Sequence, residues 1–226
     1  MRRLGFLLAP LLLGACQSQT SDPAAPDAVV NADWDNIGFD AKEQRHSPLT
    51  QINDSNVAEL GIAWFKDLPD ARGQEATPVV VDGKLYISTA WSKVFAYDAK
   101  TGEELWSYDP GVAGEKAVDA CCDVVNRGVA INRGKLFFGT IDGRLIALDA
   151  NTGARLWETQ TTDNSKPYTI TGAPRVVKNM VIIGNGGAEF GVRGYVSAYN
   201  VRDGLLKWRF YTVPNPKGEA DGAASD

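Results

Sequence analysis

The sequence predicts an all-β protein, a β-propeller built of four-stranded antiparallel blades. A short pattern recurs three times and ends each time in a tryptophan; Trp106, Trp157 and Trp208 follow one another at intervals of 51 residues. The 23 glycines and 6 tryptophans of the 226-residue chain suit short strands joined by tight turns. A four-stranded sheet repeated at a period of this size is typical of propeller blades.

Within each repeat, a bend joins two apolar, strand-like runs. The recurring pattern covers residues 96–106, 147–157 and, more loosely, 198–208. It contains an Asp/Asn-x-x-x-Gly bend, whose glycine is free to take positive φ. Two further runs precede each bend, so strands of the second unit are expected at 128–131, 135–139, 144–149 and 155–159. We expect the repeated tryptophans to dock each blade on the next.

Three complete units extend from about residue 77 to residue 211, and a partial piece at 33–65 precedes them. Residues 61–65 resemble the last strand of a blade whose other strands are missing. A propeller has roughly four to eight blades and closes on itself, whereas three units and one strand leave an open edge. We therefore expect residues 31–226 to form the N-terminal part of a larger propeller.

The first thirty residues read as a sorting signal and a tether. A basic start at Arg2 and Arg3 precedes an apolar run over 4–13, about half the roughly 20 residues of a membrane-spanning helix, as in a cleaved export signal. The run ends in Leu-Gly-Ala-Cys, which resembles the lipobox of bacterial lipoproteins and would make Cys16 a lipid anchor. The alternative is an ordinary cleaved signal that leaves Cys16 loose. We expect a signal at 1–15 and a flexible, polar tether at 16–30.

Composition excludes several classes of function. The net charge of −5 offers no basic footprint for nucleic acid. A single histidine, His46, leaves little room for a histidine metal site, and the absence of Cys-x-x-Cys-His argues against c-type haem in this chain.

Cys121 and Cys122 stand side by side, and the other cysteine, Cys16, lies in the targeting segment. A disulfide can persist outside the cytoplasm, where Cys122 is the partner left for Cys121. Such a bond closes a very small ring and is expected to strain the intervening peptide, a feature often found at functional sites. The alternative is a pair of reduced cysteines buried in the core.

From about residue 33 to 214 the chain resembles the quinoprotein methanol and ethanol dehydrogenases, which depend on pyrroloquinoline quinone (PQQ) and fold as eight-bladed propellers. The opening resembles theirs in Trp34, Gly38 and residues 45–53. More specific are three loop motifs, Cys121-Cys122 with Arg127, Gly-Gln-Glu-Ala-Thr-Pro at 73–78, and Gly-Asn-Gly-Gly-Ala-Glu at 184–189. The resemblance implies a periplasmic enzyme.

The resemblance assigns roles to the first two loops and to Thr171. Cys121 and Cys122 match a vicinal disulfide that packs flat on one face of the quinone. Arg127 matches an arginine that reaches the reactive carbonyl, where a fixed cation stabilises developing negative charge. Glu75 matches a glutamate that hydrogen-bonds the edge of the cofactor, and Thr171 matches a threonine that contacts one of its carboxylates.

The third loop is expected to carry both cofactor and cation contacts. Gly186, Gly187 and Ala188 match a close backbone approach to PQQ, which small residues permit. Glu189 matches a carboxylate ligand of the active-site cation, calcium or a lanthanide, and calcium prefers oxygen ligands. The alternative is a long glycine-rich hairpin with an exposed glutamate.

The implied reaction is oxidation of a primary alcohol to an aldehyde by hydride transfer to PQQ. The cation would polarise the quinone carbonyl, an aspartate would take the hydroxyl proton, and a cytochrome c would accept the electrons. By the family pattern the aspartate and the other cation ligands fall beyond Asp226, so no catalytic base is expected within these residues and the chain alone is expected to be inactive. Two rival classes are a propeller lipoprotein scaffold of outer-membrane assembly and the membrane-bound quinoprotein sugar dehydrogenases, which lack adjacent cysteines.

Overall fold

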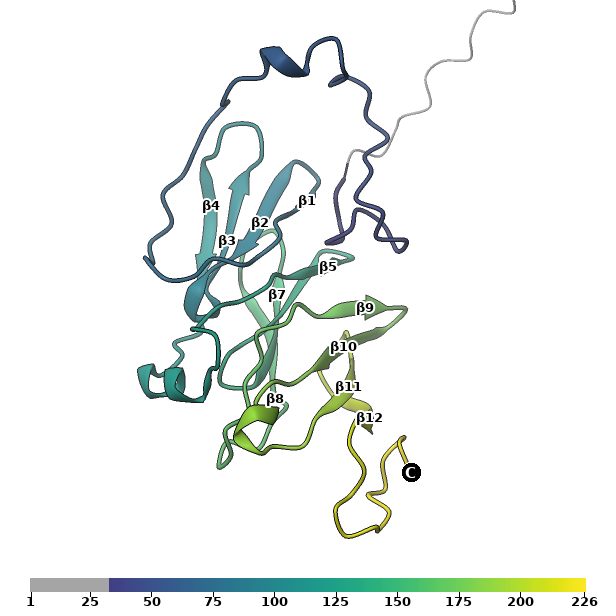
Figure 1. Cartoon of the computed structure of the whole chain (residues 1–226). Helices are drawn as coiled ribbons and strands as arrows, with labels where there is room; N and C mark the ends of the chain where they lie inside the picture. Colours follow the sequence, from purple (N-terminus) through teal and green to yellow (C-terminus); the bar gives the residue numbers. More distant parts are fainter. Residues whose placement is uncertain (1–32) are drawn as a thin grey trace, which may run out of the picture. The chain divides into compact units, whose positions relative to one another are not determined.

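Three antiparallel sheets of four strands follow one another along the chain (Figure 1). The computed structural model describes residues 33–226; the predicted signal, the Cys16 anchor and the tether lie outside the described residues. The strands are β1 (Val79–Val81), β2 (Lys84–Ser88), β3 (Val94–Asp98), β4 (Glu104–Tyr108), β5 (Ala130–Asn132), β6 (Lys135–Gly139), β7 (Arg144–Asp149), β8 (Arg155–Gln160), β9 (Arg175–Val177), β10 (Met180–Gly184), β11 (Tyr195–Asn200) and β12 (Leu206–Tyr211). Four short 3-10 helices are η1 (Val57–Glu59), η2 (Ala90–Ser92), η3 (Gly114–Asp119) and η4 (Ala188–Phe190).

The strands are ordered β1-β2-β3-β4, β5-β6-β7-β8 and β9-β10-β11-β12, so each sheet is a meander of neighbours. This confirms the predicted class and the three four-stranded blades. The expected strands of the second unit agree with the structure to within two residues at each end. The pairing of each third strand with its fourth also shifts register at the same place in every blade, between Ala96 and Tyr97, Ala147 and Leu148, and Ala198 and Tyr199.

The repeated bends have one geometry. In the first, the Asp98 carboxylate accepts hydrogen bonds from the backbone N–H groups of Lys100 and Thr101, and Gly102 donates to the Asp98 carbonyl across 2.8 Å. The hydrogen bonds that the carboxylate accepts, that of the Thr101 backbone first, hold the pKa of Asp98 below its ordinary value. Gly102 has φ of +74°, a left-handed conformation that favours glycine.

The strands at the centre of the protein are buried on both faces. Successive side chains of a strand point to opposite sides, so Leu136 and Phe138 pack in a cluster with the first sheet, while Phe137 packs in a second cluster with the third sheet. All three side chains are fully buried. This explains why 135–139 is a continuous apolar run rather than an alternating one.

Tryptophans join consecutive blades, as the repeat predicts. The Trp106 indole donates a hydrogen bond to the Ala150 carbonyl across 3.0 Å and covers Gly153, where an added Cβ would lie 2.8 Å from the indole ring. Trp157 repeats the arrangement on the next bend, with the Val201 carbonyl 3.2 Å away. Each blade thus reaches forward onto the bend of the blade that follows.

Residues 61–65 differ from the expectation, because they form no strand. A strand requires a neighbouring ladder, and none of the described strands pairs with this segment. Trp64 nevertheless takes the docking position on the first blade, donating to the Ala99 carbonyl across 3.1 Å and covering Gly102. The resemblance to a blade's last strand therefore holds for the tryptophan and not for the backbone.

The fold places three loops at equivalent positions. Strands β1, β5 and β9 are the first of their blades, and β5 neighbours both β1 and β9. The loops leading into these strands carry Glu75, Arg127 and Thr171. Within residues 33–226, no helix combines the length and apolar character needed to cross a bilayer.

Candidate functional site

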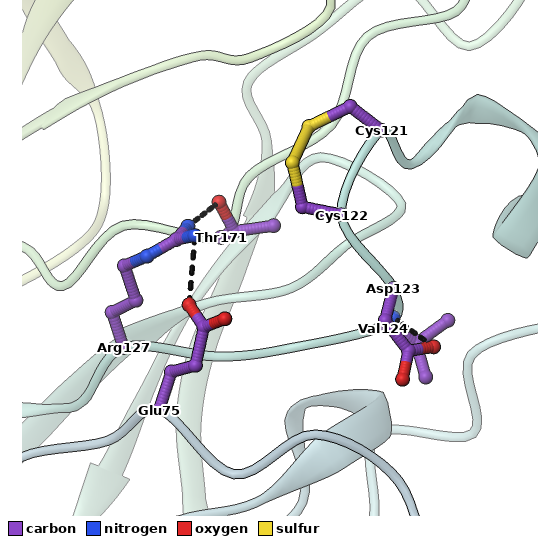
Figure 2. Close-up of a disulfide and its surroundings, with 7 residues drawn as sticks. All are labelled: Glu75, Cys121, Cys122, Asp123, Val124, Arg127 and Thr171. Carbon is purple, nitrogen blue, oxygen red and sulfur yellow. Dashed lines mark hydrogen bonds and ion pairs between the residues drawn. A yellow bond between two sulfur atoms is a disulfide. The ribbon is translucent and has the colours of Figure 1, made fainter.

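Arg127 joins the loops of three blades (Figure 2). Its Nη2 lies 2.8 Å from Oε2 of Glu75, and its Nη1 donates a hydrogen bond to the Thr171 hydroxyl. Its backbone N–H also donates to the Thr171 carbonyl across 2.9 Å. The three predicted residues therefore meet, although they come from segments far apart in sequence. The Arg127 and Glu75 side chains remain 43% and 42% exposed, so they can face a ligand.

A buried amide holds the Arg127 loop from beneath. Asn126 donates from Nδ2 to the Gly139 carbonyl across 2.8 Å, and its Oδ1 accepts from the Ser88 hydroxyl and the Gly128 N–H. A buried amide with all these partners satisfied fixes the loop that bears it. The sequence analysis did not single out Asn126, whose place between buried valines and an arginine offers only a weak signal.

Cys121 and Cys122 are bonded through their sulfur atoms, with their Cα atoms 3.8 Å apart. Both residues are exposed, on the loop that continues into Asp123, Val124 and Arg127 (Figure 2). The alternative of two reduced cysteines buried in the core is wrong for this structure. Val124 and Val125, which follow, are the residues of this loop that enter the core.

Asp123 and Arg72 form an ion pair that sequence reasoning missed. The Arg72 guanidinium donates to both Asp123 carboxylate oxygens, and the carboxylate also accepts from the backbone N–H groups of Gly73 and Val124. These hydrogen bonds, that of Arg72 first, hold the pKa of Asp123 far below its usual range. The carboxylate is therefore ionised throughout the neutral range.

The glycine-rich loop follows β10 and pairs with the loop before β9. Gly186 and Thr169 exchange backbone hydrogen bonds, with 2.7 Å from the Gly186 nitrogen to the Thr169 oxygen. The Asn185 side chain accepts from the Tyr195 N–H across 2.9 Å. Beyond them, Gly187 is buried, whereas Ala188 and Glu189 are exposed on η4.

Gly187 tests whether the shape of this loop requires glycine. Its φ is +104°, and an added Cβ would lie 2.3 Å from the Pro167 carbonyl oxygen. We expect Gly187→Ala to lower the free energy of unfolding by about 3 kcal/mol, the upper end of the range for strained backbone, as measured by urea denaturation. The matched control is Gly191→Ala, with φ of +83° and open space around the added Cβ, which should cost only about 1 kcal/mol. Equal losses would contradict the steric account.

A cavity of about 280 Å³ lies between these loops, lined by Arg127, residues 170–173 and residues 183–186. The predicted residues Arg127, Thr171 and Gly186 therefore line one hollow. Among residues 33–226, no hydrogen bond or ion pair connects Glu189 to the residues lining this cavity, and Gly187 and Ala188 do not line it. In that same range, no three His, Cys, Asp or Glu side chains gather to hold a metal ion.

Comparisons with known proteins agree with this architecture. Residues 34–226 match the family model described as PQQ, the glucose/ethanol/alcohol dehydrogenase β-propeller domain. The chain is 60% identical over 195 residues to quinohemoprotein alcohol dehydrogenase ADH IIB of Pseudomonas putida, covering 85% of this chain and 28% of that protein. It is 58% identical over 189 residues to 1-butanol dehydrogenase (cytochrome c) of Thauera butanivorans, covering 83% and 27%.

Among solved structures, quinohemoprotein alcohol dehydrogenase from Comamonas testosteroni superposes with a TM-score of 0.82 at 52% identity, covering 85% of this chain and 29% of that one. The chain thus spans less than a third of the length of these relatives. The matched propeller, the three blades and the identity over most of the described residues show that the chain belongs to the family of PQQ-dependent alcohol dehydrogenases.

Proposed function

We propose that these residues form the N-terminal part of the cofactor site of an enzyme that oxidises primary alcohols to aldehydes and passes the electrons to a cytochrome c. The observation that carries the proposal is the meeting of Glu75, Arg127 and Thr171 from three blades, on loops that also present an exposed disulfide. The name of the Thauera relative, a butanol dehydrogenase that uses cytochrome c, supports the substrate class and the acceptor.

The residues present fit PQQ. The cofactor is a planar, tricyclic quinone with three carboxylates, and when bound it supplies the two-electron oxidant. The site offers one guanidinium, a hydroxyl and glycine-rich backbone beside a cavity, which are suitable partners for carboxylates and carbonyls. The proposed binding residues are Glu75, Cys121, Cys122, Arg127, Thr171, Gly186, Gly187 and Ala188.

Each group has a definite task in this proposal. The Arg127 cation holds a donor toward the ligand and is itself oriented by Glu75 and Thr171, so little reorganisation is needed when charge develops nearby. The disulfide is a compact apolar surface without hydrogen-bonding hydrogens, suited to a ring face. Thr171 presents its hydroxyl from the neighbouring blade.

The cation site does not fit on these residues alone. Calcium takes about 6–8 oxygen ligands, whereas Glu189 stands without a second acidic partner in the described part of the chain. We propose Glu189 as one ligand of calcium or a lanthanide, with the remaining ligands and the aspartate base outside these 226 residues.

A chimera tests the function. Residues 32–226 would replace the matching segment of the Pseudomonas putida relative, and dye reduction would be followed with ethanol and with 1-butanol, with and without added PQQ. We expect PQQ-dependent oxidation in the chimera and none from the 226-residue chain alone. A folded chimera that fails to retain PQQ would refute the proposed cofactor site. Turnover by the 226-residue chain alone would refute the proposal that the aspartate base and the other cation ligands lie outside these residues.

We also propose that the protein is periplasmic and that Cys16 is lipidated. The proposed boundaries are a signal at 1–15, a tether at 16–30 and a propeller domain at 31–226. Metabolic labelling with a radioactive fatty acid should mark the wild-type chain and not Cys16→Ser.

A further inference from the structure

Two ion pairs of opposite polarity connect the same two segments. Arg72 pairs with Asp123, and a few residues further along both segments Glu75 pairs with Arg127. The first segment therefore carries a positive charge followed by a negative one, and the second carries the reverse. A displaced register would bring like charges together, so the pairs specify a single alignment of 72–75 against 123–127.

Asp123 holds this alignment at the end next to the disulfide. It follows Cys122 directly, and its φ of +70° is a left-handed conformation that aspartate tolerates better than most residues. Its carboxylate accepts from the Arg72 side chain and from the N–H groups of Gly73, at 3.2 Å, and Val124, at 2.8 Å. We call Asp123, Arg72 and these two N–H groups the Asp123 latch.

The approach of the two segments is close at the latch. A Cβ added to Gly73 would lie 3.0 Å from Cγ1 of the buried Val125. Before the latch, Asp70 pairs with Lys93 across 3.2 Å, so the first segment is also fixed at its beginning. Between Asp70 and Glu75, the Arg72 side chain and the Gly73 backbone N–H donate hydrogen bonds to the Asp123 carboxylate of the second segment.

We propose that Asp123 is a positioning residue, which couples the Cys121–Cys122 disulfide to the segment bearing Glu75 so that both face one ligand as a unit. That the disulfide and Glu75 face one ligand rests on the proposed function, in which this ligand is a planar anionic quinone. The coupling itself does not depend on the ligand. An exposed ion pair alone contributes little to stability. The Asp123 carboxylate has more than an ion pair, because it accepts from two nitrogens of Arg72 and from the Gly73 and Val124 N–H groups and lies next to Cys122.

Coupling of this kind is reciprocal. If the latch favours the loop geometry that the disulfide imposes, then reducing the disulfide must loosen the latch, and breaking the latch must favour reduction. Dithiothreitol provides the reductant: the sulfur–sulfur bond becomes two thiols, and dithiothreitol is oxidised to its cyclic disulfide.

The first measurement uses the unaltered 226-residue chain. Hydrogen exchange, followed by mass spectrometry, would compare residues 72–76 before and after reduction by dithiothreitol and alkylation with iodoacetamide. We expect exchange there to become about tenfold faster, as for loss of one hydrogen bond to a charged group. Amides in β6 and β7 should be unchanged. Unchanged exchange at 72–76 would overturn the proposal without any variant that could misfold.

The second measurement is the dithiol–disulfide equilibrium against dithiothreitol in Asp123→Asn, Arg72→Ala and the double variant. Asn keeps the side-chain oxygen and the tolerance of positive φ but loses the charge. We expect each variant to shift the equilibrium toward the dithiol by about tenfold, and the double variant to shift it no further, because the two groups act through one contact. Arg155→Ala, which removes an exposed pair with Glu158, should leave it unchanged. Additive shifts, or none, would refute the latch.

The two proposals can fail separately. A coupled latch in a chain whose chimera does not retain PQQ would leave the latch standing and remove the proposed function. An active chimera whose disulfide equilibrium ignores Asp123→Asn would do the opposite.

Discussion

Replacing Arg127 by alanine in the chimera is expected to lower the rate of alcohol oxidation by about 10²–10³-fold, the loss typical of removing one preorganised group that stabilises developing charge. Arg127 holds two partners, the Glu75 carboxylate and the Thr171 hydroxyl, from two other blades. Its loss removes the cation and also leaves the Glu75 carboxylate without its counter-charge. The measurement is dye-linked kcat and KM, with bound PQQ quantified by absorbance.

Two further variants separate charge from geometry. Arg127→Lys retains a positive charge but not the planar fork that reaches both partners, so we expect an intermediate loss. Arg155→Ala removes an exposed arginine of β8 that does not line the cavity, and it should leave the rate unchanged. Wild-type activity in a folded Arg127→Ala chimera would contradict the proposed role.

Replacing Trp106 by alanine is expected to reduce the free energy of unfolding of the chain by about 3–5 kcal/mol, the range for a large aromatic side chain in a packed interior. The indole packs beside Tyr86, with ring centroids 6.0 Å apart, and on Gly153 of the next blade. The substitution opens a cavity between two sheets and removes one of two donors to the Ala150 carbonyl, the other being the Tyr86 hydroxyl. Urea denaturation, monitored by circular dichroism, measures the loss.

Trp208 provides the matched control, because it has the same position in the third blade. Within residues 33–226 its indole N–H has no acceptor, and it borders an apolar hollow with Val196 and Phe210. We expect Trp208→Ala to cost less than about 1 kcal/mol, as for a surface substitution. Similar losses for Trp106→Ala and Trp208→Ala would show that docking between blades is not the source of the stability.

The blades could be predicted because their determinants are local and repeated. Each unit contains an apolar run, a bend of the Asp98–Gly102 type and a tryptophan. Because the pattern occurs three times, it predicts the blade more strongly than one copy would. Residues 61–65 show the limit of this reasoning. Their sequence resembles a strand, but a strand exists only where another segment supplies the ladder, and sequence pattern alone does not reveal a missing neighbour.

The candidate site could be predicted in part. Glu75, Arg127 and Thr171 were identified by family resemblance, and the structure brings them together. Arg72 and Asp123 were not identified, because their pairing joins residues 51 apart in loops without periodicity. Asn126 was missed for a different reason. It holds the Arg127 loop through its burial and its hydrogen bond to the Gly139 carbonyl, and the local sequence predicts neither.

The forward reach of the tryptophans makes blade-to-blade contact directional, so two copies of the chain cannot use it to form a symmetric dimer. Within the described residues the contact runs one way, from the tryptophan of one blade to the bend of the next, and the first bend has no preceding sheet to supply it. That bend is already occupied, because Trp64 of the same chain covers Gly102 and binds the Ala99 carbonyl. Trp64 therefore gives the first bend the same indole cover that Trp106 and Trp157 give the bends of the second and third blades.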